Sequence, residues 1–253
     1  MVYNSLTEIP RNLKEGIDWL VALRGTGDED NLKAMGTALY RFMLSKPLGK
    51  MELPALEKVK RFSKYFLRKP ELEGYPFVKE MLKRYNAPMD KNPKKIGNVI
   101  KGIEESDYKN VVKARDTKPE AIARNLGKVV DAYEKFLDDI KIPDQYESAY
   151  SSEATWGTSC SEDPEACVVV LVGIAPMLYA GVSALQNAGK ASSKYGPGSP
   201  ADERVGVVVK AAGFDEPACR SSVNGSELRK ALGSVDKRVL DILYDLAGFW
   251  AFY

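Results

Sequence analysis

Apolar side chains recur at spacings of three and four residues along most of this chain, and no segment alternates apolar and polar residues convincingly in the manner of a strand. This spacing, with glycine or proline at many boundaries, predicts helices over the ranges 7–24, 28–46, 52–69, 75–85 and 117–140, with a further helix opened by Asn92-Pro93. Thr117-Lys118-Pro119-Glu120 has the form of a capping box and predicts that Thr117 caps the 117–140 helix. The pattern indicates an all-α protein.

The second part of the chain, from residue 143 onward, differs in composition. Residues 143–158 form a polar connection rich in serine and tyrosine, and Asp163-Pro164 opens a helix without charges. Glycine, proline and serine gather in residues 189–200, which predicts a loop there. We expect the remaining helices over the ranges 199–212, 226–232 and 234–252.

The twenty residues from Ala166 to Leu185 carry no charge. Such a run is long enough to cross a bilayer, and it is equally suited to the buried centre of a large helical domain. Gly173 and Pro176 within the run, and the lack of a strongly basic flank, favour the buried helix. We therefore expect one compact multi-helix domain over residues 1–253, built around a buried central helix at 166–185. A subdivision into 1–142 and 159–253 stays open.

Composition narrows the possible chemistry. Lys and Arg number 37 against 35 Asp and Glu, and a net charge of +2 argues against a dedicated nucleic-acid binder. The sequence has no histidine, which excludes histidine-based catalytic triads and histidine metal ligands. Three cysteines cannot form a four-thiolate zinc site. We expect no catalytic residues, no cofactor and no metal, so that the protein is not an enzyme.

The cysteines admit several pairings. Cys160 lies just before the uncharged helix and Cys167 in its first turn, a separation that a disulfide bridges if the intervening chain doubles back. Cys219 could pair with either of them, and three reduced thiols are the other alternative. A catalytic cysteine is not expected, because no histidine is present to activate it.

Basic residues gather between positions 51 and 100, where twelve Lys or Arg stand against six acids. On the 52–69 helix the spacing predicts four of them on the face opposite the apolar stripe, namely Lys60, Arg61, Lys64 and Arg68. A solvated helix face is the usual explanation of such a pattern. Docking to an anionic membrane or a glycan surface is the alternative.

The predicted loop is the candidate recognition site. It contains Ser192, Ser193, Lys194, Tyr195 and Gly196 and has no sustained apolar period. We expect that deleting residues 192–198 leaves thermal stability nearly unchanged and alters the binding of an antibody or receptor. A plain connector between two helices is the alternative.

Three stretches carry a family resemblance: LTEIPRNLKEGIDWL at residues 6–20, EACVVVLVGIAPMLYAG at 165–181 and LYDLAGFWAFY at 243–253. They are similar to segments of the Babesia variant erythrocyte surface antigens. The resemblance implies a protein displayed on infected red cells, varied to evade host antibody and implicated in adhesion to a receptor on host endothelium. A related antigen subunit is a further partner to consider.

Members of that family lack an ordinary signal peptide and end with a membrane anchor, whereas this sequence stops at Tyr253 without such an anchor. The resemblance therefore implies an ectodomain fragment or a short paralogue, with membrane association only through an anchor outside this chain. The alternative is a helical interaction or scaffold module without membrane display, either internal to the parasite or secreted.

Overall fold

The computed structural model describes residues 2–87, 104–215, 217–219 and 223–253. This part of the chain is helical, with two isolated bridges and no β-strand. Its helices are α1 Leu13–Arg24, α2 Asp28–Leu44, α3 Pro54–Leu67, α4 Pro70–Glu73, α5 Pro76–Asn86, α7 Glu105–Tyr108, α8 Val111–Ala114, α9 Pro119–Ile140, α10 Trp156–Ser159, α11 Pro164–Tyr195, α12 Pro200–Ala211, α13 Gly225–Ala231, α14 Lys237–Leu246 and α15 Phe249–Phe252. The all-α prediction is confirmed.

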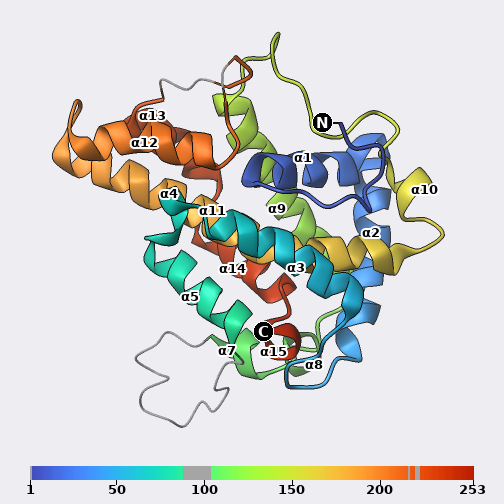
Figure 1. The fold of residues 1–253 in the computed structure, drawn as a ribbon. Coiled ribbons are helices and arrows are strands. Elements are labelled where there is room, and N and C mark those ends of the chain that lie inside the picture. The colour runs from blue at the N-terminus through green and yellow to red at the C-terminus, as the bar shows by residue number, and fades with distance from the viewer. Residues whose placement is uncertain (1, 88–103, 216, 220–222) are drawn as a thin grey trace.

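Helix α11 lies at the centre of the fold. It packs against α1, α2, α3, α5, α12, α13 and α14, and Figure 1 shows it running through the middle of the molecule between them. By length and composition the helix could cross a membrane, but 94% of its most apolar stretch is buried inside the protein. The prediction of a buried, uncharged central helix is therefore confirmed.

Glycines let the helices around this core approach one another closely. A Cβ added to Gly173 of α11 would lie 2.6 Å from the Cβ of Val59 in α3. A Cβ on Gly36 of α2 would lie 2.8 Å from the backbone nitrogen of Ala123 in α9. Neither position has room for a side chain, because real Cβ atoms do not approach other heavy atoms so closely. These glycines therefore set the spacing of the helix pairs α11–α3 and α2–α9.

Two predicted helix starts are wrong. Helix α1 begins at Leu13 rather than near Thr7, because the Asn12 side chain accepts a hydrogen bond from the backbone N–H of Glu15 at 2.9 Å and caps the helix there. Helix α9 is capped by Lys118 without a side-chain hydrogen bond, so the capping box predicted at Thr117 does not form. Its start is fixed instead by a proline at the first helical position.

The predicted helix 234–252 is broken in two. Gly248 adopts a left-handed conformation with φ of +64° and separates α14 from α15. A Cβ at this glycine would meet the rings of Phe252 and the side chain of Met43 at about 3 Å. The break turns the chain back on itself, so that α15 and Tyr253 are buried. The helix predicted to open at Asn92-Pro93 lies outside the described residues.

The C-terminal residues also cover part of the α3 face that the sequence predicted to be solvated. Lys60, predicted on a solvated face, is only 3% exposed. Its Nζ pairs with Glu57 at 2.7 Å and donates to the Phe252 carbonyl at 2.8 Å, and it lies 4.4 Å from the centre of the Tyr253 ring. Burial lowers the pKa of Lys60, and the Glu57 carboxylate opposes that shift. The predicted solvated face is therefore wrong for Lys60, whereas Arg61 and Arg68 are exposed and Lys64 is half-buried.

Candidate functional site

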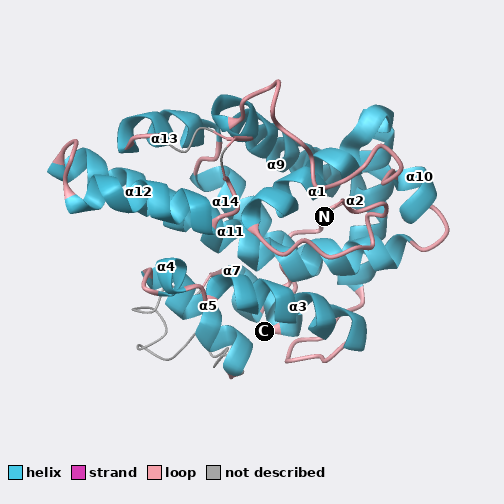
Figure 2. Cartoon of the chain, turned by 45° about the horizontal axis from the view of Figure 1, so that its top comes forward, coloured by secondary structure: helices cyan, strands magenta, loops and turns pink. Residues whose placement is uncertain are grey.

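The predicted recognition loop is mostly helix. Helix α11 continues beyond its uncharged run to Tyr195, and only residues 196–199 connect it to α12. Figures 1 and 2 show α11 and α12 running side by side to one edge of the molecule, where they meet. The loop predicted over residues 189–200 is therefore wrong for residues 189–195, which form the end of α11, and for Pro200, which opens α12.

Polar contacts keep this last turn helical. The Ser192 hydroxyl donates to Oδ1 of Asp202 in α12 at 2.6 Å, and the backbone N–H of Gly198 donates to Oδ2 of the same carboxylate at 3.1 Å. The N–H of Gly225 in α13 approaches Oδ1 at 3.4 Å. The bond from Ser192, followed by those from the two glycines, lowers the pKa of Asp202. Contacts with two other helices thus override the loop propensity of the local sequence.

Close packing against α13 adds to these contacts. Ser192 is only 3% exposed, and a Cβ on Gly225 would lie 2.3 Å from the Cβ of Ser192. A Cβ on Gly189 would lie 3.0 Å from Cγ of Arg229. A deletion of residues 192–198 would remove this packing together with the Ser192–Asp202 bond. The expectation that the deletion is thermally neutral therefore does not fit the structure, and we expect it to lower stability.

What remains exposed is the hairpin tip, which we define as residues 194–198. The Tyr195 side chain is 67% exposed, and Lys194 lies beside it with Nζ 5.3 Å from the ring centre. Gly196 and Gly198 have φ of +86° and +74°, a backbone conformation that favours glycine. The hairpin tip thus presents an aromatic ring and a cation on a support held by defined contacts.

A groove of about 540 Å³ lies between α5, α11, α13 and α14. One wall is aromatic, with the rings of Phe77 and Tyr179 in an edge-on contact at 6.0 Å. Lys190 and Arg229 are among the exposed cations that line it. The remaining lining residues are Glu104, Ser183, Gln186, Asn187, Leu232, Lys237, Leu240 and Asp241. This mixture of aromatic, amide and charged side chains suits a polar ligand or a peptide segment.

Sequence reasoning missed the groove, although one signal for it existed. Ser183 near the end of the uncharged run is followed by Gln186, Asn187 and Lys190 at spacings of three, one and three residues, which places the four on one face of a continuing helix. Recognising that face required α11 to extend past Leu185. The opposite wall comes from residues far away in the sequence, for which no local pattern exists.

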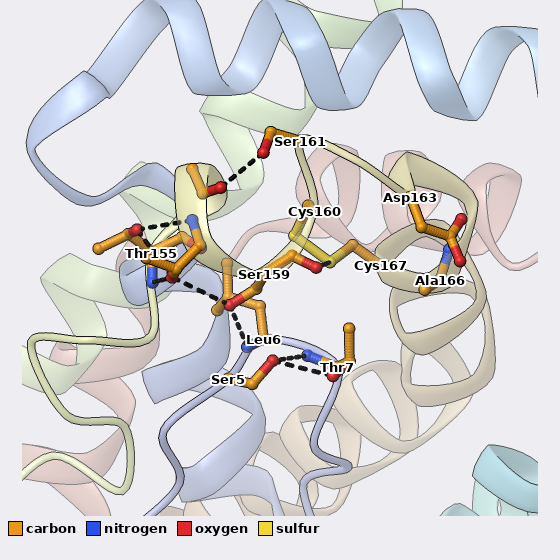
Figure 3. Close-up of a disulfide and its surroundings, with 12 residues drawn as sticks. Ser5, Leu6, Thr7, Thr155, Ser159, Cys160, Ser161, Asp163, Ala166 and Cys167 are labelled. Atoms are coloured by element: carbon orange, nitrogen blue, oxygen red, sulfur yellow. Dashed lines mark hydrogen bonds between the residues drawn. A yellow bond between two sulfur atoms is a disulfide. The ribbon is translucent and has the colours of Figure 1, made fainter.

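The cysteine pairing left open by the sequence is resolved. Cys160 and Cys167 form a disulfide that joins the end of α10 to the first turn of α11 (Figure 3). The Ser159 hydroxyl beside it accepts a hydrogen bond from the backbone N–H of Leu6 at 3.0 Å. This bond holds the N-terminal segment against the end of α10, next to the disulfide. Cys219 is free and buried, and burial raises the pKa of its thiol to about 11. Its thiol therefore stays protonated at neutral pH.

The most buried charged cluster is closed to solvent. Arg84 donates from Nη1 to Oδ1 of Asp107 at 2.8 Å, and the Tyr244 hydroxyl donates to the same oxygen at 2.7 Å. Asp107 is fully buried, so this arrangement satisfies the charge of Arg84 and offers no access to a substrate. Within the described residues no group of three or more histidine, cysteine or acidic side chains could hold a metal ion.

No family model, curated protein or solved structure matches this chain. The three segments that carry the family resemblance nevertheless come together in space. A Cβ on Gly16 of α1 would meet Leu178 of α11 at 2.9 Å, and a Cβ on Gly181 of α11 would meet Leu13 of α1 at 3.3 Å. In the third segment, the Tyr244 ring packs against the Tyr179 ring of the second, with ring centroids 5.5 Å apart. All three segments therefore belong to one core.

Proposed function

We propose that this protein is a non-enzymatic variant surface antigen of Babesia-infected erythrocytes, with host antibody and a receptor on host endothelium as its partners. The observation that supports the proposal is where the three family-like segments lie. Most of their side chains are buried in the core, and the first two segments pack on each other at Gly16 and Gly181. An antigen that varies has to keep its core while it changes the surface that it presents.

The surface offers places for such change. The hairpin tip lies outside the three family-like segments and carries exposed Tyr195 and Lys194. Aromatic side chains of this kind contribute large contact areas at protein interfaces at low entropic cost. Since both glycines of the tip lie in open space, the side chains around them could change without disturbing the core. We infer that the hairpin tip contacts the receptor or the antibody.

The oxidised cysteine pair agrees with export. A disulfide between Cys160 and Cys167 is typical of a protein that works outside a reducing cytosol. Display would place this domain at the surface of the infected red cell.

Two measurements test the proposal. An antibody raised against the recombinant domain should label intact infected erythrocytes, and labelling only after permeabilisation would contradict display. The purified domain should bind endothelial cells, and Tyr195→Ser should weaken that binding. Val207→Ser, which changes another exposed side chain of the same hairpin, is the matched control and should bind normally.

The second candidate function is a helical interaction or scaffold module without display, inside the parasite or secreted. The groove between α5, α11, α13 and α14 favours it, because its aromatic wall and exposed cations suit a peptide from a partner protein. Mass spectrometry of protein isolated from the parasite under non-reducing, thiol-trapping conditions separates the internal form from display. Three free thiols would favour a reducing internal compartment, whereas an intact Cys160–Cys167 bond would favour export.

A further inference from the structure

A row of exposed cations runs along the outer face of α3, which lies on the surface of the molecule in Figure 1. Lys58, Arg61, Tyr65 and Arg68 follow one another at spacings of three, four and three residues, so that they share one face of the helix and its end. We call these four residues the α3 stripe. At 1.5 Å per residue the stripe is about 15 Å long.

The cations of the α3 stripe are not neutralised by neighbouring acids. Within the described residues, Lys58, Arg61 and Arg68 form no ion pair, and the nearest acid along the helix, Glu57, is bound to buried Lys60 at 2.7 Å. Because Glu57 is paired with buried Lys60, it does not neutralise the exposed cations of the α3 stripe. Burial, and then repulsion by Arg68 and Lys50, lowers the pKa of neighbouring Lys64. The outer face of α3 therefore concentrates positive charge.

Aromatic rings are interleaved with these charges. The Tyr65 side chain is 69% exposed, which makes it the most exposed large apolar or aromatic side chain within the described part of the chain. Phe62 lies at the edge of the stripe, and the guanidinium of Arg11 lies 5.7 Å from its ring centre. Arg11 comes from the segment before α1, so a second part of the chain extends the positive surface.

We propose that the α3 stripe binds a sulfated polysaccharide. A straight row of cations without a pocket matches a linear polyanion, whose bound counterions are released when the protein replaces them. The exposed Tyr65 ring offers a flat apolar face on which a sugar ring can stack. A lipid surface fits less well, because a membrane-binding helix inserts several apolar side chains and the stripe has no exposed aliphatic residue. This surface is separate from the hairpin tip and goes beyond the function proposed above.

The test uses the whole chain and heparin as the probe. We expect heparin to bind at physiological salt, with an affinity that falls as salt rises. The triple variant Lys58→Gln, Arg61→Gln, Arg68→Gln should weaken binding by roughly tenfold or more and flatten the salt dependence, because three charge contacts are lost. The matched control is Lys210→Gln, Lys230→Gln, Arg238→Gln, which removes the same charge from exposed positions on α12, α13 and α14. It should bind heparin as the wild type does.

Tyr65→Ser separates stacking from charge. This variant should lower heparin affinity while leaving the salt dependence unchanged, and circular dichroism should confirm that all variants remain folded. The proposal is overturned if heparin does not bind, if desulfated heparin binds equally well, or if the control triple variant loses as much affinity as the stripe variant. Equal or stronger binding of the stripe to phosphatidylserine vesicles or duplex DNA would also overturn it, in favour of a membrane or a general polyanion surface.

Discussion

The two halves of α11 form one continuous helix but are held in place by different interactions. Residues 166–185, which we call the apolar half, are almost completely buried among the other helices. Residues 186–195, the hairpin half, are anchored by Ser192 on Asp202 and by close packing between Gly189, Gly225 and Arg229. The first half is stabilised by removal of apolar surface from water, and the second by a few polar and steric contacts whose geometry is specific.

This difference separates what is fixed from what can change. Disturbing the apolar half affects every helix packed around it, since α11 contacts most of the fold. The hairpin half contacts α12, α13 and the Val235 carbonyl, to which Gln186 donates at 2.7 Å, so we expect its disturbance to leave the rest of the core in place. A protein that varies its surface needs such a division. The experiments below, in order of expected effect, test whether the division is real.

The largest effect is expected from a charge in the apolar half. Leu171 is fully buried, and Leu171→Asp should destabilise the domain by several kcal/mol, enough to unfold it, because the buried carboxylate has no partner. Lys194→Asp, at the exposed end of the same helix, should leave the urea midpoint nearly unchanged. A folded Leu171→Asp domain with wild-type stability would show that the helix is not buried as described.

The next effect concerns the start of the apolar half. Replacing Cys160 and Cys167 by serine opens a small loop, for which the chain-entropy model gives a loss of about 2–3 kcal/mol. Chemical denaturation of the double variant, compared with a Cys219→Ser control, would measure it. We expect a lower midpoint with an unchanged helical spectrum. A double variant as stable as the wild type would mean that the disulfide does not hold this end.

A smaller effect is expected where α13 meets the hairpin half. Gly225→Ala should cost roughly 1–2 kcal/mol, because its new Cβ would overlap Ser192. Adding Ser192→Gly should recover part of that loss by removing the obstructing atoms, which a double-mutant cycle would detect. Gly233→Ala is the control, since its Cβ would meet nothing within 4 Å. Purely additive losses would contradict the contact.

The smallest expected effect on stability comes from Asp202 and depends on pH. Its lowered pKa means that the folded state favours the carboxylate, so this stabilisation is present above the ordinary pKa of an aspartate and is lost as pH falls through the lowered value. Asp202→Asn should therefore lower the melting temperature slightly at neutral pH, and the gap to wild type should close in acid. A gap that stays constant with pH would exclude the carboxylate as its source.

Most of what the sequence predicted correctly depends on local pattern. The uncharged run from Ala166 to Leu185 identified the central helix without reference to any other part of the chain. The proximity of Cys160 and Cys167 in sequence made their disulfide a realistic option. Helix order followed from periodicity, and errors arose at boundaries, where a proline or a capping asparagine decides the exact residue.

The failures share a different cause. Ser192 looks like a loop residue until Asp202 and Gly225 are placed beside it, and Lys60 looks solvated until the Phe252 carbonyl is brought to it. The groove similarly depends on side chains from four helices. In each case the deciding partner is distant in sequence, so hydrophobic periodicity carried no information about it.

Hydrogen exchange along α11 in detergent-free buffer tests the division between its two halves most directly. We predict that backbone amides of residues 168–185 exchange only through global unfolding, whereas those of residues 190–195 exchange through a smaller opening. Gly225→Ala should accelerate exchange in the second group, whereas exchange in the first group should rise only in step with the loss of global stability. Uniform exchange along the whole helix, or rapid exchange in residues 168–185, would contradict a buried core joined to a separately held hairpin.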